Sequence, residues 1–370
     1  MARVALGSSR LGRLDPGFWD GRRVLLTGHT GFKGAWLSVW LQTLGAELTG
    51  LSRDVPTKPS LYELARVGAG MKDEIEADVR DFEAVAAAIG RSRPEIVIHM
   101  AAQAFVRRSF VEPRETYETN VLGTVNVLEA IRLNGGIRAV VNVTSDKCYE
   151  NREWEWGYRE DEPMGGFDPY SASKGCAELV TSAFRRSFFT PDSGDTRLAS
   201  VRAGNVVGGG DWGEDRLLAD VMRAALEGRS LNVRNPDAIR PWQHVLNPLS
   251  GYLMLVQALW DSDDYATAWN FGPAEVEARP VSWIVERVKE LWPAELQWEH
   301  DAGPQPHEAR YLRVDSSRAR LRLGWRPTWG LDEALDRTVE WYEAFADGAD
   351  MRAATLRQVE AFAQAQSVGV

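Results

Sequence analysis

A tyrosine and a lysine four residues apart, Tyr170 and Lys174, form a pair suited to acid–base chemistry. Residues four apart on a helix lie one turn apart on the same face. A lysine ammonium beside a phenol stabilises the phenolate, so a tyrosine with an ordinary pKa of about 10 can act as a base near neutral pH. Such pairs are common by chance on surface helices. This one gains weight because it follows Thr144 and Ser145, which end a predicted strand.

Three glycines spaced G-x-x-G-x-x-G lie within residues 27–34, between the first predicted strand and the first predicted helix. Glycine lets the backbone approach a pyrophosphate, and a helix N-terminus offers free N–H groups with a partial positive charge. A structural turn is the alternative explanation. The position after the first strand favours a dinucleotide, whose positive nicotinamide ring would also favour the Tyr170 phenolate. The predicted contacts are Gly28, Thr30, Gly31, Phe32, Lys33 and Gly34.

The end of the second predicted strand bears on the type of dinucleotide. Asp54 can accept a hydrogen bond from a ribose 2′-hydroxyl, whereas Arg53 can pair with a 2′-phosphate or stack on adenine. Asp78, after the third predicted strand, is a candidate for the adenine amino group. We predict NAD rather than NADP.

Short apolar segments alternate with helix-length segments up to about residue 205. The predicted strands are Arg23–Thr27, Leu48–Leu51, Glu74–Ala77, Ile96–Met100, Ala139–Val143 and Leu198–Arg202, and the predicted helices are Phe32–Leu44, Phe82–Ile89, Thr116–Arg132 and Asp168–Phe188. Continuous apolar strands separated by helices indicate a parallel sheet covered on both faces. We therefore predict an α/β fold with a Rossmann-type doubly wound parallel sheet. Such sheets bind ligands beyond the carboxyl ends of their strands. Gly28, Ala101 and Thr144–Lys147 each directly follow a predicted strand and therefore lie at this edge.

The regular alternation of strands and helices ends at about residue 205, where Gly208–Gly210 begins an irregular segment and prolines recur. A smaller C-terminal lobe for substrate is expected here. The predicted organisation is an N-terminal extension (1–17), an NAD-binding domain (18–204), a lobe mainly for the substrate (205–345, with 240–270 returning to the first domain) and a C-terminal helix (346–370).

Composition and charge exclude several function classes. Of the 370 residues, 44% are hydrophobic and 26% charged, which is typical of a globular protein. A net charge of −10 disfavours nucleic acid as a partner, because such binding needs a cationic face. No apolar run of about 18 residues or secretory signal occurs, so a cytoplasmic protein without a membrane partner is expected. Two cysteines and five scattered histidines predict no metal site.

Longer motifs resemble the extended short-chain dehydrogenase/reductase (SDR) family over roughly residues 18–345. The glycine loop and the pair Tyr170 and Lys174 are joined by Ala101–Gln103, Thr144–Lys147, Arg240–Trp242 and Leu323–Pro327. The more specific runs, Ser145–Asn151, Glu153–Tyr158, Gly165–Tyr170, Gly209–Trp212 and Pro241–Val245, are similar to those of 4,6-dehydratases acting on nucleotide sugars. The resemblance alone implies CDP-glucose as the substrate, since no single residue identifies cytosine.

The resemblance implies a three-stage reaction on one hexose. Tyr170 removes the C4 hydroxyl proton while NAD+ takes the C4 hydride, water leaves across C5 and C6, and the hydride returns to C6. Ser145 would bind the C4 oxygen, and Asp146 would act as the acid that expels the C6 hydroxyl. Related enzymes acting on dTDP-glucose carry glutamate where Lys147 stands. Lys147 is then either a C5 base with a deprotonated amine, an enolate-stabilising cation, or a structural partner of Asp146.

The remaining site residues follow from the same resemblance. Further cofactor contacts are expected from Arg53, Asp78, Val79, Ala101, Ala102, Gln103, Thr119, Thr144, Tyr170 and Lys174, and substrate contacts from Gln103, Asn205, Arg216 and Arg240. The planar fork of Arg240 suits a pyrophosphate. Arg216 has the alternative of a surface ion pair with Glu214, Asp215 or Asp220. Trp154 and Trp156 either close over the sugar or anchor their loop, and anchoring is favoured.

Two other functions are compatible with these motifs. One is a 4,6-dehydratase or epimerase acting on a dTDP-, GDP- or UDP-sugar. The other is a binding module that has lost its chemistry, which the retained Tyr170, Lys174, Ser145 and Asp146 disfavour. The family also implies a homodimer, formed through the helices predicted at Thr116–Arg132 and Tyr170–Phe188.

Overall fold

A parallel sheet of seven strands forms the centre of the protein. The computed structural model describes residues 12–274, 277–301, 303 and 311–368. The sheet has the order β11-β6-β5-β4-β1-β2-β3, with β1 at Arg23–Thr27, β2 at Glu47–Ser52, β3 at Asp73–Glu76, β4 at Ile96–His99, β5 at Ala139–Val143, β6 at Arg197–Ala203 and β11 at Ala268–Phe271. In the register, Val24 of β1 lies between Leu48 and Ile96. The strand order reverses between β1 and β4, where doubly wound sheets bind ligands.

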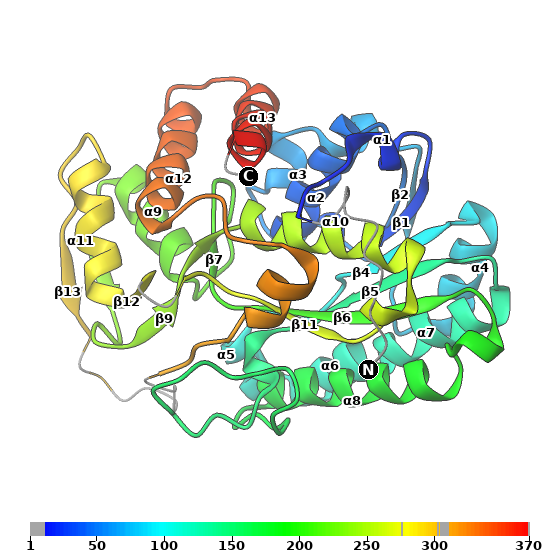
Figure 1. Cartoon of the computed structure of the whole chain (residues 1–370). Coiled ribbons are helices and arrows are strands. Elements are labelled where there is room, and N and C mark those ends of the chain that lie inside the picture. Colours follow the sequence, from blue (N-terminus) through cyan, green and yellow to red (C-terminus); the bar gives the residue numbers. More distant parts are fainter. Residues whose placement is uncertain (1–11, 275–276, 302, 304–310, 369–370) are drawn as a thin grey trace.

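Helices cover both faces of the sheet (Figure 1). One face is covered by α2 (Phe32–Thr43) and α10 (Leu246–Asp261), and the other by α4 (Phe82–Ser92), α7 (Gly123–Asn134) and α8 (Pro169–Ser187). Successive strand residues point to opposite faces, so Val24 and Leu26 pack into the first layer and Leu25 into the second. These observations confirm the predicted Rossmann-type fold.

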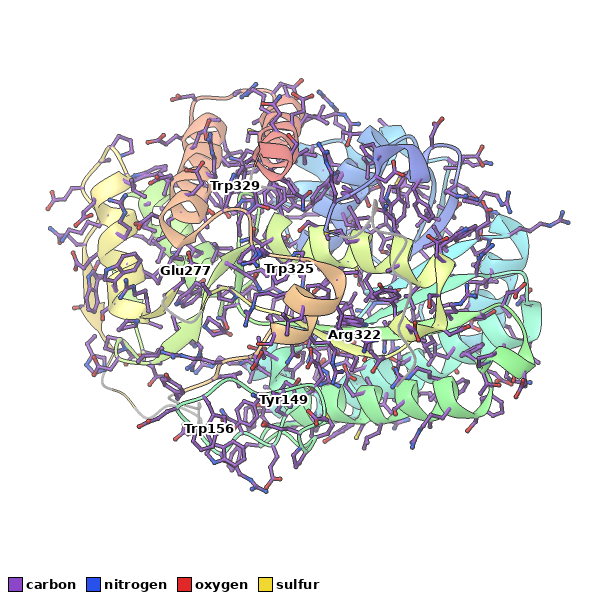
Figure 2. All side chains as sticks on the ribbon, viewed as in Figure 1. Tyr149, Trp156, Glu277, Arg322, Trp325 and Trp329 are labelled. Carbon is purple, nitrogen blue, oxygen red and sulfur yellow. The ribbon has the colours of Figure 1, made fainter. Side chains whose placement is uncertain are left out.

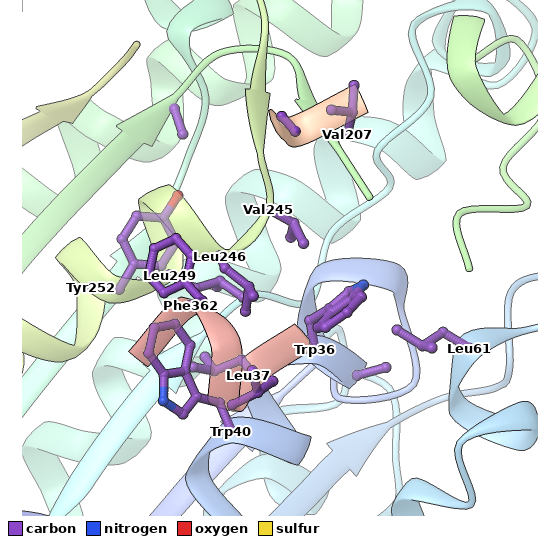
Figure 3. Packing of buried hydrophobic residues seen from close by; sticks show 14 of the residues in the cluster. Trp36, Leu37, Trp40, Leu61, Val207, Val245, Leu246, Leu249, Tyr252 and Phe362 are labelled. Carbon is purple, nitrogen blue, oxygen red and sulfur yellow. The ribbon is translucent and has the colours of Figure 1, made fainter. Parts of the chain in front are cut away.

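The larger core lies between the sheet and the α2–α10 layer. Trp36 and Trp40 of α2 are buried there together with Leu249 and Tyr252 of α10. Figure 3 shows these side chains packed around α2 with Phe362 of the last helix. The predicted strands did not include β11, because its four residues follow α10 in a segment interrupted by turns. It extends the sheet beside β6, in register from Ala268 with Ser200 to Phe271 with Ala203.

The helix predicted at 116–132 is interrupted. It consists of α6 (Pro113–Tyr117), a π-helical turn η2 (Glu118–Leu122) and α7. A π turn places one extra residue in the helix and re-aims the side chains within it, and such turns occur often at functional sites. Here the extra residue lies in the stretch that carries Thr119 and Asn120.

The smaller lobe lies beyond the carboxyl edge of the sheet, at the left of Figure 1. It contains α9 (Leu217–Glu227), β8 (Leu231–Val233), β9 (Ile239–Pro241), β12 (Ala278–Pro280), α11 (Val281–Leu291), β13 (Trp298–His300) and α12 (Leu331–Ala346). β8 pairs with β13 and β9 with β12, while β7 (Val206–Val207) and β10 (Gln243–His244) pair nearby. The last helix, α13 (Met351–Val368), packs on α2 and α12.

Short elements complete the described chain. They are α1 (Pro16–Trp19), α3 (Leu61–Leu64), η1 (Val67–Gly70), α5 (Val106–Val111), η3 (Asp146–Cys148), η4 (Pro191–Ser193), η5 (Asp263–Tyr265) and η7 (Ala319–Leu323). Most of the predicted N-terminal extension, residues 1–11, lies outside the described residues. Its remainder is packed on the protein, since Leu14 is buried and the Asp15 amide donates to Gln257. No helix among the described residues has the length and apolar character needed to cross a membrane.

Candidate active site

One cavity of about 810 Å³ opens at the carboxyl ends of the central strands and continues into the smaller lobe. Every residue that the sequence analysis assigned to cofactor, catalysis or substrate lines it. These are Gly28, Thr30, Gly31, Phe32, Lys33, Gly34, Arg53, Asp78, Val79, Ala101, Ala102, Gln103, Thr119, Thr144, Ser145, Asp146, Lys147, Tyr170, Lys174, Asn205, Arg216 and Arg240. The sheet therefore brings together segments as far apart in the chain as Gly28 and Arg240.

The glycine loop has the shape that a pyrophosphate requires. A Cβ at Gly34 would lie 2.1 Å from the carbonyl oxygen of Gly28, and a Cβ at Gly28 would lie 2.7 Å from the amide nitrogen of Ala101. These two glycines are therefore demanded by backbone packing. Gly31 precedes the first turn of α2, has no side-chain cap, and has nothing closer to its Cβ position than 3.4 Å. The open N–H groups of α2 and the space at Gly31 fit the pyrophosphate of NAD.

Carboxylates surround Arg53 at the adenosine end of the cavity. Its guanidinium lies 3.0 Å from Asp54, 3.1 Å from Glu115 and 3.6 Å from Asp78. A 2′-phosphate placed here would meet three negative charges, and the arginine that could compensate for it is already paired. This arrangement fits NAD and disfavours NADP.

Tyr170, Ser145 and Asp146 meet in the middle of the cavity. Asp168 caps the N-terminus of α8 by accepting from the Ser171 amide at 2.9 Å, so Tyr170 begins the first turn of that helix. Ser145 follows β5, and its hydroxyl donates to Asp146 Oδ1 at 3.1 Å and also shares a hydrogen bond with Tyr170. All three residues are buried. The serine therefore connects the candidate base to the candidate acid.

The pKa of Tyr170 differs from the expectation. Burial raises the pKa of Tyr170 to about 12, opposed chiefly by the hydrogen bond with Ser145. In the protein alone, burial costs the phenolate more than the hydrogen bond with Ser145 and the charge of Arg216 return. The stabilisation of the phenolate by Lys174 and the nicotinamide ring stays a prediction for the protein with NAD bound. Burial also lowers the pKa of Lys174 to about 8, and the nearby Glu178 carboxylate opposes this shift.

Asp146 has the environment of a proton donor. Burial raises the pKa of its carboxyl group, against the opposing charges of Lys147, Arg240 and Lys33. Oδ2 has no hydrogen-bond partner in the described part of the chain. A Cβ at Gly204 would lie 3.0 Å from this oxygen, so the glycine leaves room for it. A buried carboxyl group with a raised pKa holds its proton until a reacting group takes it.

Lys147 lines the same cavity without binding Asp146. Asp146 Oδ1 accepts from Ser145, and its Oδ2 accepts from no described residue, so the lysine acts on that carboxylate only as a charge at a distance. The structural pairing of Lys147 with Asp146, one of the three interpretations of this lysine, has no support in this geometry.

Lys33 reaches beyond the glycine loop that carries it. Its Nζ donates to the hydroxyl of Tyr252 on α10 at 3.2 Å. Burial lowers the pKa of Lys33 to about 7, aided by the charges of Arg216 and Lys174 and opposed by Asp146. Lys33 is one of the predicted cofactor contacts, and its ammonium group also lies among the charges of the catalytic centre.

A buried ion pair that the sequence analysis missed supports the catalytic helix. Glu178 lies one turn after Lys174 and pairs with Arg202 of β6 at 2.7 Å, with both side chains less than 5% exposed. Its two oxygens also accept hydrogen bonds from Thr144 and Ser200. The spacing Tyr170, Lys174, Glu178 repeats every four residues, which is the sequence signal that could have identified the glutamate.

Asn120 in the π turn is a second missed residue. Its Oδ1 accepts from the Gln103 amide at 2.8 Å, and its Nδ2 donates to the Gln103 carbonyl at 3.0 Å and to Ser173 on α8 at 2.9 Å. It thereby connects the loop after β4 to the catalytic helix. The neighbouring Thr119 hydroxyl lines the cavity and has no partner among the described residues, as a ligand-binding hydroxyl would.

The residues assigned to substrate lie towards the smaller lobe. Arg240 is only 4% exposed, and its Nη1 donates to the Ile239 carbonyl at 3.0 Å, which orients the guanidinium. Arg216 pairs with Asp211 at 3.1 Å, and not with the neighbouring acids considered from the sequence. The Asp211 pairing leaves the rest of its guanidinium along the cavity wall.

The two loop tryptophans do not line the cavity. Trp154 stacks on Tyr158, which stacks on Tyr149, with ring centroids 5.6 Å and 5.2 Å apart. Trp156 contacts Trp154 and is 60% exposed at the outer edge of this stack (Figure 2). This packing matches the anchoring interpretation.

Comparisons with known proteins agree with this geometry. The family model for GDP-mannose 4,6-dehydratase matches residues 25–338. The chain is 52% identical over 356 residues to CDP-glucose 4,6-dehydratase of Salmonella typhimurium strain LT2, covering 95% of this chain and 99% of that protein.

Two solved structures share the fold. One is the UDP-glucose 4-epimerase of Thermus thermophilus in complex with NAD, with a TM-score of 0.76, 26% identity, and coverage of 87% of this chain and 99% of that one. The other is the dTDP-glucose 4,6-dehydratase DesIV double mutant of Streptomyces venezuelae with NAD bound, with a TM-score of 0.75, 22% identity, and coverage of 89% and 99%.

Proposed function

The chain belongs to the GDP-mannose 4,6-dehydratase family of the extended short-chain dehydrogenases/reductases, and from this premise we infer the reaction that it catalyses. It is an NAD-dependent 4,6-dehydratase that converts CDP-D-glucose to CDP-4-dehydro-6-deoxy-D-glucose and water. The observation that carries the substrate is 52% identity over 95% of the chain to an enzyme with that activity. The buried acid beside Tyr170 suits dehydration, because an epimerase needs no group to expel a C6 hydroxyl.

The site supports a division of labour among four side chains. Tyr170 takes the proton of the C4 hydroxyl, and Ser145, hydrogen-bonded to it, holds the C4 oxygen. Asp146 gives its proton to the C6 hydroxyl, which leaves as water. The glycine loop at Gly28, Gly31 and Gly34 would hold NAD, which would supply the hydride acceptor for C4, the hydride for C6, and a positive ring that favours the Tyr170 phenolate. Lys174 contributes a second cation one turn away on α8.

The C5 proton is assigned to Lys147. A ketone at C4 makes this proton acidic. A neutral amine at Lys147 would remove the proton as a base, whereas an ammonium at Lys147 would stabilise the enolate that forms. Lys33 and Arg240 line the same cavity, and both charges act on Asp146 beside Lys147, which favours a stabilising role for positive charge at this point.

An assay on defined substrates tests the function. The protein is incubated with NAD+ and CDP-glucose, alkali is added, and the ultraviolet absorbance typical of a 4-keto-6-deoxy sugar is measured. Product is expected from CDP-glucose, with much less from the dTDP-, GDP- and UDP-linked sugars. Product from one of those sugars and none from CDP-glucose would assign a different nucleotide, and inversion at C4 without loss of water would assign an epimerase.

The assembly that we propose is a homodimer. Of the ten large apolar side chains that are exposed in the described part of the chain, seven lie on α5–α8 and the residue after α8. They are Phe110, Val111, Tyr117, Leu122, Leu133, Leu179 and Phe188. These helices contact one another, and exposed apolar side chains gathered on neighbouring helices are typical of a protein–protein interface, where two copies of a helical face can pair about a twofold axis.

The division of the chain into an NAD-binding domain up to 204 and a nucleotide-sugar lobe from 205 to 345 is part of the same proposal. The position of α9, β8 and β9 around the far half of the cavity supports it. A cytoplasmic location is expected because nucleotide sugars and NAD are cytoplasmic metabolites.

A further inference from the structure

The far end of the cavity is the place for the nucleobase. NAD occupies the stretch from Arg53 and the glycine loop to Tyr170, and the hexose must reach Tyr170 and Asp146. The pyrophosphate of the substrate then lies near Arg240, and what remains is the end formed by α9, β8 and the start of α11. This placement rests on the proposed function.

Apolar side chains form part of the walls of this end. Leu218 of α9, Val233 of β8 and Ala238 are buried and line the cavity, and Val281 at the start of α11 lines it as well. Apolar walls suit the faces of a flat ring but do not distinguish one pyrimidine from another. Discrimination requires a polar group that meets the ring edge at the position where cytosine and uracil differ.

Asp220 is such a group. It lies one turn into α9 and lines the cavity. Its Oδ1 accepts from Arg223 Nη1 at 2.7 Å, and Arg223 Nη2 in turn donates to the Trp212 carbonyl at 2.9 Å, which fixes the carboxylate. Its Oδ2 accepts no hydrogen bond within the described ranges. The carboxylate therefore presents one oriented acceptor to the cavity.

Two charged neighbours keep their own partners. Asp215 accepts from Arg234 at 2.7 Å and from Arg107 at 3.2 Å. Both arginines are thus held by Asp215 on the same side of the cavity, and Arg234 does not bond to Asp220. A ring edge with a hydrogen-bond donor would satisfy Asp220, whereas a carbonyl oxygen would be repelled by it.

We propose that Asp220 Oδ2 accepts a hydrogen bond from the exocyclic amino group of cytosine and so selects CDP-glucose over UDP-glucose and dTDP-glucose. Cytosine carries an amino group where uracil and thymine carry an oxygen, and a carboxylate is a natural partner for that amino group. With uracil or thymine, the ring carbonyl oxygen and Asp220 Oδ2 would be two hydrogen-bond acceptors facing each other.

Asp220→Asn tests this assignment, because the amide keeps the shape and can offer an N–H group to a carbonyl oxygen. We expect the ratio of kcat/KM for CDP-glucose to that for UDP-glucose to fall by about 10- to 100-fold. Most of the change should be in KM, since Asp220 is remote from the reacting atoms. Glu227→Gln, which removes the same charge from the exposed end of α9, is the matched control and should leave the ratio unchanged.

Direct binding gives a second measurement that needs no turnover. Calorimetry with CDP and UDP should show that Asp220→Ser weakens CDP binding and strengthens UDP binding, because the serine removes the charge that repels the uracil carbonyl. An unaltered preference for CDP in both variants would overturn the role of Asp220 while leaving the dehydratase function intact. If the unmodified protein instead forms no product from CDP-glucose, the proposed function itself is wrong.

Discussion

Asp146 and Lys147 are adjacent in the chain and line one cavity, yet their surroundings give them different chemistry. Asp146 is buried, its carboxyl pKa is raised, and one of its oxygens has no partner among the described residues, all of which suit a proton donor. Lys147 is less enclosed and is bonded to no carboxylate in the described chain. The surroundings of Asp146 therefore match the role of the acid, whereas those of Lys147 are compatible with either a base or a stabilising cation.

Substitutions of Lys147 separate its two remaining roles. Lys147→Ala should lower the rate of water loss by about 100-fold or more and leave NAD binding intact. Lys147→Arg keeps the cation and cannot deprotonate, so it should retain much of the activity if the lysine stabilises an enolate and lose it if the lysine is a base. Product formation and bound dinucleotide are measured for both variants. Near-normal turnover of Lys147→Ala would remove the residue from the mechanism.

The dependence of the rate on pH should report Lys174. Burial lowers the pKa of Lys174 to about 8, so its ammonium is present below that pH and lost above it. If the ammonium supports the Tyr170 phenolate, kcat/KM declines as the pH rises through about 8. Glu178 raises the pKa of Lys174, so Glu178→Gln should move the decline to lower pH.

A fold control accompanies this experiment, because Glu178→Gln leaves the buried Arg202 without its charge partner and is expected to cost about 3–5 kcal/mol. Thermal unfolding of the variant therefore sets the temperature of the assay. If kcat/KM declines at the same alkaline pH in the folded variant and in the original protein, Glu178 does not set the pKa of Lys174.

At the scale of elements, the loop between β1 and α2 combines a packing requirement with a binding requirement. Gly28 and Gly34 allow the backbone segments to approach each other, and Gly31 leaves the N-terminus of α2 open. The π turn between α6 and α7 acts similarly for Asn120, which joins the β4 loop to α8. In both cases a local departure from regular structure positions groups at the end of the sheet.

Two alanine substitutions in the loop should affect different properties, one the stability of the fold and the other the affinity for NAD. In Gly34→Ala the new Cβ meets a carbonyl oxygen at 2.1 Å, so the variant should be destabilised by about 1–3 kcal/mol or more. In Gly31→Ala the backbone is extended and has room, so stability should change by less than about 1 kcal/mol while NAD affinity falls at least about tenfold. Thermal unfolding and NAD titration are the measurements. Equal loss of stability in both variants would contradict this division.

At the scale of the whole molecule, the apolar face on α5–α8 is on the side of the sheet opposite α2 and α10 (Figure 1). Phe110 of this face also lines the cavity, so the face extends to the edge of the cavity. Phe188 is partly covered by the Arg132 guanidinium at 5.3 Å, which holds the ends of α7 and α8 together within this face.

A single charge on that face should prevent association. Leu179 is 60% exposed on α8, and Leu179→Glu would place a carboxylate at the proposed interface, where its desolvation costs several kcal/mol. The variant should have half the mass of the original protein in light scattering. Leu321→Glu, at a residue 85% exposed on η7, is the matched control and should not alter the mass. A monomeric original protein would refute the dimer.

Much of this protein is determined by local patterns in its sequence. Apolar segments and glycine spacing predicted six of the seven strands of the sheet, and the motifs around Ser145 and Tyr170 identified residues that line a single cavity. These predictions succeed because strand periodicity, helix caps and loop glycines act over a few residues. The seventh strand, β11, was missed since its pairing with β6 depends on a helix crossing far along the chain.

Tertiary structure decided the charges of the site. The raised pKa of Tyr170, the pairing of Arg216 with Asp211, and the Glu178–Arg202 ion pair beneath α8 all join residues from separate elements. Burial and long-range contact set the free energy of a charged group, and neither can be read from the neighbours of that group in the chain.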